Sequence, residues 1–362
     1  MIKKKLEEYL DYKQPQPYIV SNEQYSNEYK TPVLTAGKSF LLGMTNDTKG
    51  IYPASKDEPI ILFDDFTTDI KWVDFPFKVK SSACKILVPR NDTNLRFCYY
   101  GMKSLNFDAS QHKRYWISQY SQMQLPDYPN ARKAEIVERL SRIENQINIK
   151  ENQLNKLDSL VKSRFMEMFT NVDKWKLSEM AEIIMGQSPD SKSYNESGNG
   201  VPFFQGKGDF GEKYTKIGHW TTSPTKTAKL NDVLMSVRAP VGPVNIASTD
   251  CCIGRGLCAI RAENGLTNSE FLYNALKVME PEIALMGNGS TFKAINKKDV
   301  YSLLIPVAST QSQESFSKFA SLIDKSRFVV HSRYFLWLNF TFVSSTIAYS
   351  RVVSILECPK RC

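Results

Sequence analysis

The chain has 362 residues, of which 42% are hydrophobic and 12% aromatic. This length and composition exclude a disordered protein and are consistent with two domains of ordinary size, each with its own core. The net charge of +9 favours a polyanionic partner, although many soluble proteins share such a basic balance.

Cysteine and histidine usage predicts neither a disulfide framework nor a zinc site. The seven cysteines include no Cys-x-x-Cys pair, and the three histidines are widely separated. The N-terminal segment is charged, and no run approaches 18 apolar residues. We therefore expect no signal peptide, no membrane association and a location in the reducing cytoplasm.

The first predicted domain covers residues 1–130 and mixes strands with helices. Short apolar runs at residues 60–63 and 85–88 are bounded by turn residues, which predicts strands. Lys38 lies in a string that ends like a phosphate-binding loop, but Pro32 stands where the motif requires its first glycine. We therefore expect no nucleotide site there.

An acidic cluster in the same domain invites an enzymatic interpretation. Asp64, Asp65 and Asp69 precede Lys71, and carboxylates with a nearby lysine are typical of metal-dependent nucleases. Surface charges around a turn explain the cluster better, and we predict no catalytic and no metal-ligating residue.

Residues 131–170 predict one long helix, because this segment contains neither glycine nor proline. Its apolar residues recur at spacings of three and four, the pattern of a coiled-coil face, and only Lys150 and Arg164 interrupt them. The predicted interface residues on this helix are Ile136, Leu140, Ile143, Ile147, Leu154, Leu157, Val161, Phe165 and Met168.

The second predicted domain covers residues 171–309. Strands are expected at residues 201–204 and 244–246, and a helix at residues 268–279. Residues 206–211 match the G-x-G-x-x-G pattern of dinucleotide-binding proteins, but no amphipathic helix follows to offer its N-terminus to a pyrophosphate. We interpret this string as a flexible, basic loop.

A shorter second helix is predicted at residues 310–333, with Phe316 and Ile323 at the positions of Ile136 and Ile143. Residues 334–362 are β-prone and lack heptad spacing. This divergent tail looks like read-through past a frameshift or a gene rearrangement, with a genuine variant as the alternative, and we expect it to pack poorly and to expose an apolar patch.

The two predicted domains resemble each other in sequence. Matching segments are 59–62 with 232–235, 84–86 with 258–260, 97–99 with 271–273 and 112–126 with 292–306, at offsets that stay between about 173 and 180. This period is far longer than the 20 to 50 residues of solenoid repeats, so whole domains are duplicated. The predicted fold class is α+β, with two similar domains separated by long helices.

Several strings together carry a family resemblance over about residues 1–333. Residues 157–165, Leu-Asp-Ser-Leu-Val-Lys-Ser-Arg-Phe, resemble the central conserved region of specificity subunits of type I restriction-modification systems. Residues 32–38 and 63–68 are similar to strings of one class of target-recognition domain in that family. Residues 186–189, 237–242 and 288–291 are similar to strings of another class.

The resemblance implies a DNA-reading subunit that is not itself an enzyme. Its two target-recognition domains would be arranged about two antiparallel helices and would each read half of a bipartite, asymmetric double-stranded site. Two methyltransferase subunits would dock on the helices, and two restriction subunits would join them. The resemblance implies no cofactor in this chain, whereas the partner subunits would use S-adenosylmethionine, ATP and Mg²⁺.

Residue chemistry and helix length agree with such a role. The helical seam spans roughly 50 Å, more than the 34 to 36 Å of one turn of B-DNA. Arginine can bond guanine, glutamine can bond adenine, and lysine mostly contacts phosphate. The predicted DNA contacts are Lys38, Lys71, Lys113, Arg114 and Tyr115 in the first domain, and Gln187, Gln205, Lys207, Arg238, Arg255 and Lys293 in the second.

Two other functions remain open from the sequence. A stand-alone metal-dependent nuclease would cleave DNA without partners, and a coiled-coil adaptor would bind DNA without sequence preference. Missing ligand clusters count against the nuclease, and two basic domains count against the adaptor.

Overall fold

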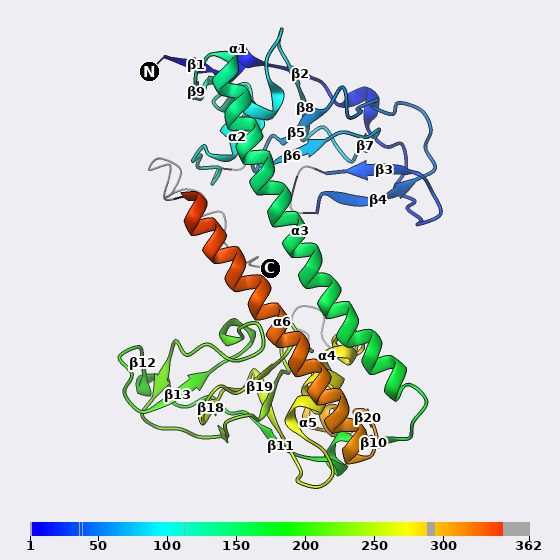
Figure 1. Cartoon of the computed structure of the whole chain (residues 1–362), viewed down its shortest axis with the longest axis vertical. Helices are drawn as coiled ribbons and strands as arrows, with labels where there is room; N and C mark the ends of the chain where they lie inside the picture. Colours follow the sequence, from blue (N-terminus) through cyan, green and yellow to red (C-terminus); the bar gives the residue numbers. More distant parts are fainter. Residues whose placement is uncertain (1, 36, 38, 112, 288–293, 343–362) are drawn as a thin grey trace. The chain divides into compact units, whose positions relative to one another are not determined.

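The computed structural model describes residues 2–35, 37, 39–111, 113–287 and 294–342. The described chain divides into two compact units, with the boundary between Ile149 and Lys150. Figure 1 shows both units and the helix α3 (Asn130–Phe169), which contributes its first part to one unit and its second part to the other.

The first unit contains two β-sheets and a short ladder. One sheet has the order β2 (Leu10–Lys13), β8 (Cys84–Pro89), β5 (Ile60–Asp64) and β6 (Ile70–Val73), with every pair antiparallel. The other has the order β4 (Leu41–Thr45), β3 (Thr31–Leu34) and β7 (Lys78–Val79), in which β3 and β7 are parallel. β1 (Lys3–Lys5) pairs with β9 (Gln124–Pro126), and the helices are α1 (Leu6–Tyr9) and α2 (Leu95–Lys103).

The central strand β5 explains why the first unit has two cores. Successive side chains of a strand point to opposite faces of its sheet. Ile61 and Phe63 pack in a core with α2, whereas Ile60 and Leu62 pack in a second core with β3 and β7. All four side chains are buried, so the continuous apolar run of β5 is that of a strand covered on both faces.

The second unit has a four-stranded antiparallel sheet in the order β11 (Ala181–Met185), β19 (Leu257–Ala262), β16 (Val233–Ser236) and β17 (Val244–Ile246). A five-stranded sheet has the order β12 (Tyr194–Asn195), β14 (Trp220–Thr221), β13 (Val201–Phe204), β18 (Cys251–Ile253) and β15 (Thr227–Ala228). β10 (Lys174–Lys176) pairs with β20 (Leu304–Pro306), and two helices, α4 (Ser269–Leu285) and α5 (Lys297–Tyr301), complete the unit with α6.

The predicted duplication of the domain is confirmed by the topology. The order β2-β8-β5-β6 is repeated as β11-β19-β16-β17, and the parallel pair β3 and β7 is repeated as β13 and β18. Even the helix caps correspond. The Asn94 side chain accepts a hydrogen bond from the Phe97 amide at 3.0 Å, and the Asn268 side chain accepts one from the Phe271 amide at 2.9 Å.

The strands predicted at 60–63, 85–88, 201–204 and 244–246 are confirmed as β5, β8, β13 and β17. The helix predicted at 268–279 is α4, which continues to Leu285. The long helix is also confirmed, and it begins at Asn130, one residue before the expected start, because the Pro129 carbonyl accepts hydrogen bonds from the Arg132 and Lys133 amides.

The predicted seam residues of α3 are at least partly shielded from solvent. Phe165 is buried, and the other eight predicted seam residues are half-buried. In the first unit, α3 packs on α2, where Glu144 accepts a hydrogen bond from Tyr100 at 2.9 Å and pairs with Arg96. A helix that supplies core residues to a domain is fixed to it by packing as well as by chain connection.

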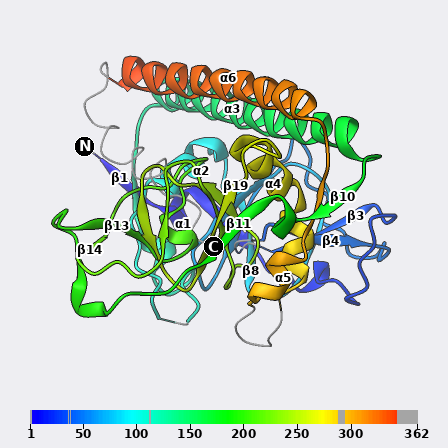
Figure 2. The same ribbon diagram turned by 90° about the horizontal axis from the view of Figure 1, so that it is seen from below.

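In the second unit, α3 runs antiparallel to α6 (Thr310–Phe342), as Figure 2 shows. The rings of Phe165 and Phe316 lie 5.4 Å apart, while Asp158, earlier on α3, pairs with Arg327, later on α6. Phe316 and Ile323 are both buried, as the seam prediction requires. The antiparallel arrangement of the two helices is therefore confirmed within this unit.

The predicted end of the second helix at residue 333 is wrong. α6 has 33 residues and continues through residues that were expected to be β-prone. Residues 310–342 contain neither glycine nor proline, and each residue added to an existing helix gains a backbone hydrogen bond. β propensity depends largely on packing within a sheet, so it does not stop a helix that has already formed. The remainder of the predicted tail, residues 343–362, lies outside the described residues.

Candidate nucleic-acid interface

In the second unit, loops from both sheets meet at one edge. β11 and β16 end there, at Met185 and Ser236, and β19 begins there, at Leu257. β13 and β18 are parallel, so they end at the same edge of their sheet. The amide of Gln187, just after β11, donates to the carbonyl of Ile253 at the end of β18 at 3.0 Å, which places this edge beside the end of β11. We call residues 186–188, 205–209, 237–238 and 254–256 the second loop edge.

Hydrogen bonds donated by backbone amides hold the loops of the second loop edge together. The Arg255 amide donates to the Ser188 hydroxyl at 3.2 Å, and the Val237 amide donates to the Gly256 carbonyl at 2.9 Å. The Asp209 carboxylate accepts from the amide of Gln205 at 2.6 Å, which closes the loop after β13. These bonds fix the backbones of the loops, and the side chains that accept them are those of Ser188 and Asp209, not those of Gln205, Arg238 or Arg255.

The structure brings together most of the second-domain residues predicted from the sequence. Five predicted contacts lie on the second loop edge with exposed side chains: Gln187, Gln205, Lys207, Arg238 and Arg255. Lys293, the sixth, lies outside the described residues. The short helical turn of residues 207–209 carries Lys207 and is followed by strands β14 (Trp220–Thr221) and β15 (Thr227–Ala228), so this string lies in a loop, as expected.

A charge network missed in the sequence joins the loop after β13 to the helices of the second unit. Lys213 bonds Glu270 of α4 at 2.8 Å and pairs with Asp324 of α6. Burial opposes the Lys213 charge, but the bonds to both carboxylates outweigh this cost and raise its pKa. Arg327 of α6 also pairs with Glu212, at 3.5 Å. Sequence spacing gave no signal for this network, because its members are far apart in the chain.

The first unit has an equivalent edge, formed by residues 14, 64–68, 80–83 and 113–119, which we call the first loop edge. In the antiparallel ladders, Lys13 lies opposite Ile86 and Asp64 lies opposite Cys84. The ends of β2 and β5 therefore meet the start of β8 at this edge. The Asp65 amide donates to the Ala83 carbonyl at 2.9 Å and joins two of its loops.

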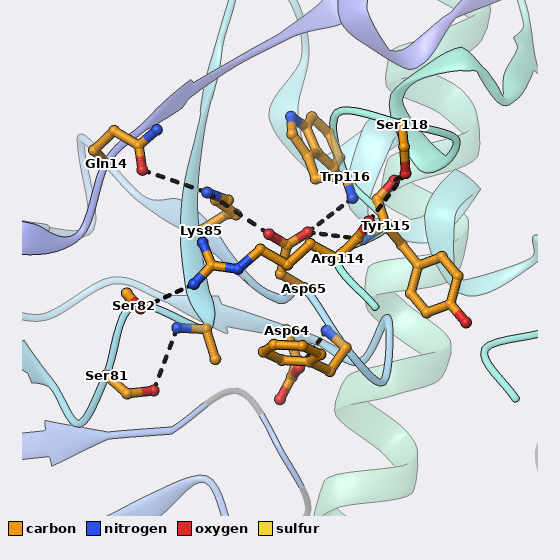
Figure 3. A network of polar contacts seen from close by, with 12 residues as sticks. Gln14, Asp64, Asp65, Ser81, Ser82, Lys85, Arg114, Tyr115, Trp116 and Ser118 are labelled. Atoms are coloured by element: carbon orange, nitrogen blue, oxygen red, sulfur yellow. Dashed lines mark hydrogen bonds and ion pairs between the residues drawn. The ribbon is translucent and has the colours of Figure 1, made fainter. Parts of the chain in front are cut away.

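Residues 113–119 complete the first loop edge through Asp65. Figure 3 shows the Asp65 carboxylate accepting hydrogen bonds from the amides of Tyr115, at 3.1 Å, and Trp116, at 2.8 Å. Arg114 is exposed, and its guanidinium donates to the Ser82 hydroxyl at 3.0 Å. This side chain therefore lies against a neighbouring loop of the same edge.

The other residues predicted as DNA contacts in the first domain are not all exposed on the first loop edge. Lys113 is exposed beside Arg114, and Lys71 is half-buried in β6, where it pairs with Leu62. Lys38 lies outside the described residues. Tyr115 is 1% exposed and packs in the core, with its hydroxyl donating to the Gln111 carbonyl, so its prediction as a DNA contact conflicts with the structure. The alternation of exposed and buried residues in this irregular segment was not visible in the sequence.

The acidic cluster of the first domain serves the fold. Asp64 accepts from the amides of Phe66, at 2.8 Å, and Thr67, at 3.1 Å, and so closes a turn. Asp65 pairs with Lys85. Among the residues that the structure describes, no group of three or more histidine, cysteine, aspartate or glutamate side chains is arranged to hold a metal ion. The cluster gives no support to a nuclease site.

In the part of the chain that the structure describes, no helix has the length and apolar character needed to span a membrane.

Comparison with known proteins gives consistent matches. A sequence model described as the type I restriction modification DNA specificity domain matches residues 170–328. The type I restriction enzyme EcoR124I/EcoR124II specificity subunit of Escherichia coli is 32% identical over 349 residues, which cover 88% of this chain and 85% of that protein. A putative type I restriction enzyme MjaX specificity subunit of Methanocaldococcus jannaschii is 35% identical over 228 residues, 57% of this chain and 54% of that protein.

A solved structure shows the same fold. The S subunit of a type I restriction-modification system from M. genitalium has a TM-score of 0.53 at 17% identity, over 92% of this chain and 91% of that chain. The chain thus matches about half the length of the M. jannaschii relative and most of the length of the other two.

Proposed function

The chain belongs to the family of type I restriction enzyme specificity subunits, and from this premise we propose that its two domains read the two halves of a bipartite, asymmetric DNA site. Its role is to provide DNA sequence specificity to a type I restriction-modification complex, and it is not itself catalytic. Neither the nuclease nor the adaptor function is supported.

One observation carries the proposal. Both units present exposed arginine and lysine side chains on loops that hydrogen bonds join at the same edge of the repeated sheet. Such loops can place donors and acceptors against base edges while their backbone keeps its shape. Because the two loop edges differ in sequence, the half-sites they read should also differ.

The proposed contacts follow from side-chain chemistry. Arg114, Arg238 and Arg255 suit guanine, and Gln187 and Gln205 suit adenine, since each can make two hydrogen bonds to a base edge. The proposed phosphate or sugar contacts are the lysines Lys38, Lys71, Lys113, Lys207 and Lys293. Tyr115 is left out because it is buried.

The proposed complex extends beyond this chain. Two methyltransferase subunits would dock on α3 and α6, and two restriction subunits would join them, in the cytoplasm where the DNA is. The partner subunits would bind S-adenosylmethionine, ATP and Mg²⁺, and this chain would determine which DNA sequence the complex recognises.

Sequencing the methylated positions in DNA from a host that expresses this chain with its methyltransferase tests the proposal. We expect two short specified elements separated by a gap of unspecified bases. Arg114→Ala should alter or weaken one element and Arg255→Ala the other. Lys56→Ala removes an exposed charge from the loop before β5, at the opposite edge of the sheet, and should leave both elements unchanged. A contiguous motif or a palindrome would contradict the proposal.

A further inference from the structure

The first unit buries an ion pair directly beneath its loop edge. Asp65 and Lys85 are 1% and 2% exposed, and they lie just after β5 and near the start of β8. The Lys85 ammonium is 3.7 Å from the Asp65 carboxylate and 3.3 Å from the Gln14 side-chain oxygen. It also lies 5.3 Å from the centre of the Tyr12 ring. The lysine is therefore compensated by a carboxylate, an amide oxygen and an aromatic face.

The Asp65 carboxylate has a second set of partners on another segment. One oxygen faces Lys85, and the other accepts the amides of Tyr115 and Trp116. The Tyr115 amide also donates to the backbone carbonyl of Asp65, at 2.9 Å. Loss of the carboxylate would leave the Tyr115 amide its bond to the Asp65 carbonyl but would take this acceptor from the Trp116 amide, and losing an acceptor at a buried site is costly. The carboxylate therefore fixes the backbone of residues 115 and 116, directly after Arg114.

The second unit holds its equivalent segment differently. The Ile295 amide donates to the Val237 carbonyl at 3.0 Å, as the Tyr115 amide donates to the Asp65 carbonyl in the first unit. Val237 and Ile295 are buried apolar residues, so the backbone bond is shared by both units while the carboxylate belongs to the first alone. The fold does not need an acid at this position, which points to a local role.

We propose that Asp65 is a positioning residue for DNA recognition: its buried carboxylate, compensated by Lys85, holds residues 115 and 116 so that Arg114 lies against Ser82 and Phe66 on the first loop edge. The inference rests on the proposed function of that edge. Arg114 would make the DNA contact, and Asp65 would act only through it. A held guanidinium loses less side-chain freedom on binding and favours one geometry of base contact.

Two double variants separate the acceptor oxygen from the ion pair. Asp65→Asn with Lys85→Met removes both charges but keeps an oxygen that can accept the Tyr115 and Trp116 amides. Asp65→Val with Lys85→Met removes the charges and the oxygen at similar volume, and imitates Val237 of the second unit. Neither leaves a buried unpaired charge, so both should fold. Each is expressed as the full chain with its methyltransferase, and the methylated motif and the methylation rate are measured.

A matched control exists in the β4-β3-β7 sheet of the same unit. The buried Lys78 pairs with Asp47 at 3.0 Å, and Asp47 also accepts the Ser21 amide at 3.0 Å; none of these three residues belongs to the first loop edge. Asp47→Val with Lys78→Met therefore removes a comparable pair without touching residues 113–119. Thermal unfolding of all three variants compares their stability.

The expected result is a loss specific to the valine variant at position 65. Methylation of the site should fall roughly tenfold, or discrimination in the first-domain half-site should relax, while the other half-site stays unchanged. The asparagine variant should retain more of this discrimination, and the Asp47 control should resemble the unsubstituted chain. An unchanged motif and rate in the valine variant would overturn the inference, as would an equal change in the Asp47 control. Absence of a bipartite motif with the unsubstituted chain would instead contradict the proposed function.

Discussion

Glycine residues set how closely the loops of the second loop edge approach one another. A side chain at Gly256 would overlap the carbonyl oxygen of Gln205, and one at Gly186 would overlap the carbonyl of Gly254. Both obstacles are backbone atoms, which cannot rotate away. Gln205 and Arg255, whose side chains are exposed, therefore lie on loops whose main chains are in direct contact.

We predict that Gly256→Ala separates these loops. Overpacking of this kind typically costs about 1–3 kcal/mol, and methylation should fall because Gln205 and Arg255 no longer keep their spacing. Gly208→Ala on the same edge is the matched control, since a Cβ there meets nothing within 4 Å. Methylation rates and motifs of both variants would check the prediction, and equal rates would show that the close approach is unimportant.

Some residues of the candidate interface could be predicted from sequence and others could not. Gln187, Gln205 and Arg255 belong to polar, glycine-containing strings after apolar runs, so their exposure at strand ends followed from local pattern. The pairing of Asp65 with Lys85 depends on which strands are neighbours, and the sequence spacing does not reveal that.

At the scale of elements, the amphipathic pattern of α3 correctly predicted a long helix, and its seam residues are half-buried except for the buried Phe165. Periodicity reports which face of a helix is buried, because every third or fourth residue returns to the same side. The sequence-based prediction was wrong for the end of α6, because the composition of residues 334–342 suggested a strand. The seam prediction relied on spacing over many turns, whereas the end of a helix depends on the capping geometry of its last few residues.

Four phenylalanines of the second unit pack together: Phe165 and Phe169 of α3, Phe271 of α4 and Phe316 of α6. Phe316 is fully buried, with ring centres 5.4 Å from Phe165, 5.7 Å from Phe169 and 6.5 Å from Phe271. We predict that Phe316→Ala destabilises this unit by about 3–5 kcal/mol.

Urea denaturation monitored by circular dichroism would measure this loss as a lower midpoint. Leu322→Ala on the same helix is the control, because Leu322 is 60% exposed and should change stability by no more than about 0.5 kcal/mol. Similar midpoints for the two variants would mean that the aromatic cluster does not hold these helices.

Asp127 joins three elements of the first unit and makes its stability depend on pH. It accepts hydrogen bonds from Lys133 of α3 at 2.8 Å and Tyr9 of α1 at 2.9 Å, and it pairs with Lys4 of β1. These bonds, that of Lys133 first, hold the pKa of Asp127 well below its ordinary value. Because the folded pKa is lowered, the stabilisation is present above the unfolded pKa of about 3.9 and is lost as pH falls below it.

We therefore predict that the unsubstituted chain loses more stability than Asp127→Asn when the pH is lowered from about 5 to about 3. Urea midpoints at both values measure the difference. Asp57→Asn, at an exposed site, should follow the unsubstituted chain. Parallel losses in the Asp127 variant and the unsubstituted chain would show that another group controls this transition.

At the scale of the whole molecule, one helix belongs to two copies of the same domain. α3 has 40 residues and a length of about 60 Å. Glu144 contacts α2 in the first unit, and Asp158 pairs with α6 in the second. The stretch between these two residues connects the copies, and under the proposed function its length would bear on the distance between the two half-sites.

We predict that four residues inserted after Asn152 lengthen the gap between the half-sites by one or two base pairs. The insertion falls between the contacts of Glu144 and those of Asp158, so each unit keeps its own packing. It adds about 6 Å and rotates the helix by roughly 40° beyond a full turn. Ten base pairs of B-DNA rise about 34 Å, so the added length is close to two base pairs.

The methylated motif of the insertion variant checks this, because both half-sites should stay the same while the number of unspecified bases between them grows. A seven-residue insertion at the same point adds about 10 Å and should lengthen the gap by about three base pairs, giving a series rather than a single value. Methylation that persists with the original gap in both variants would show that the helix does not set the spacing. The two domains would then be placed on DNA by contacts with their partner subunits.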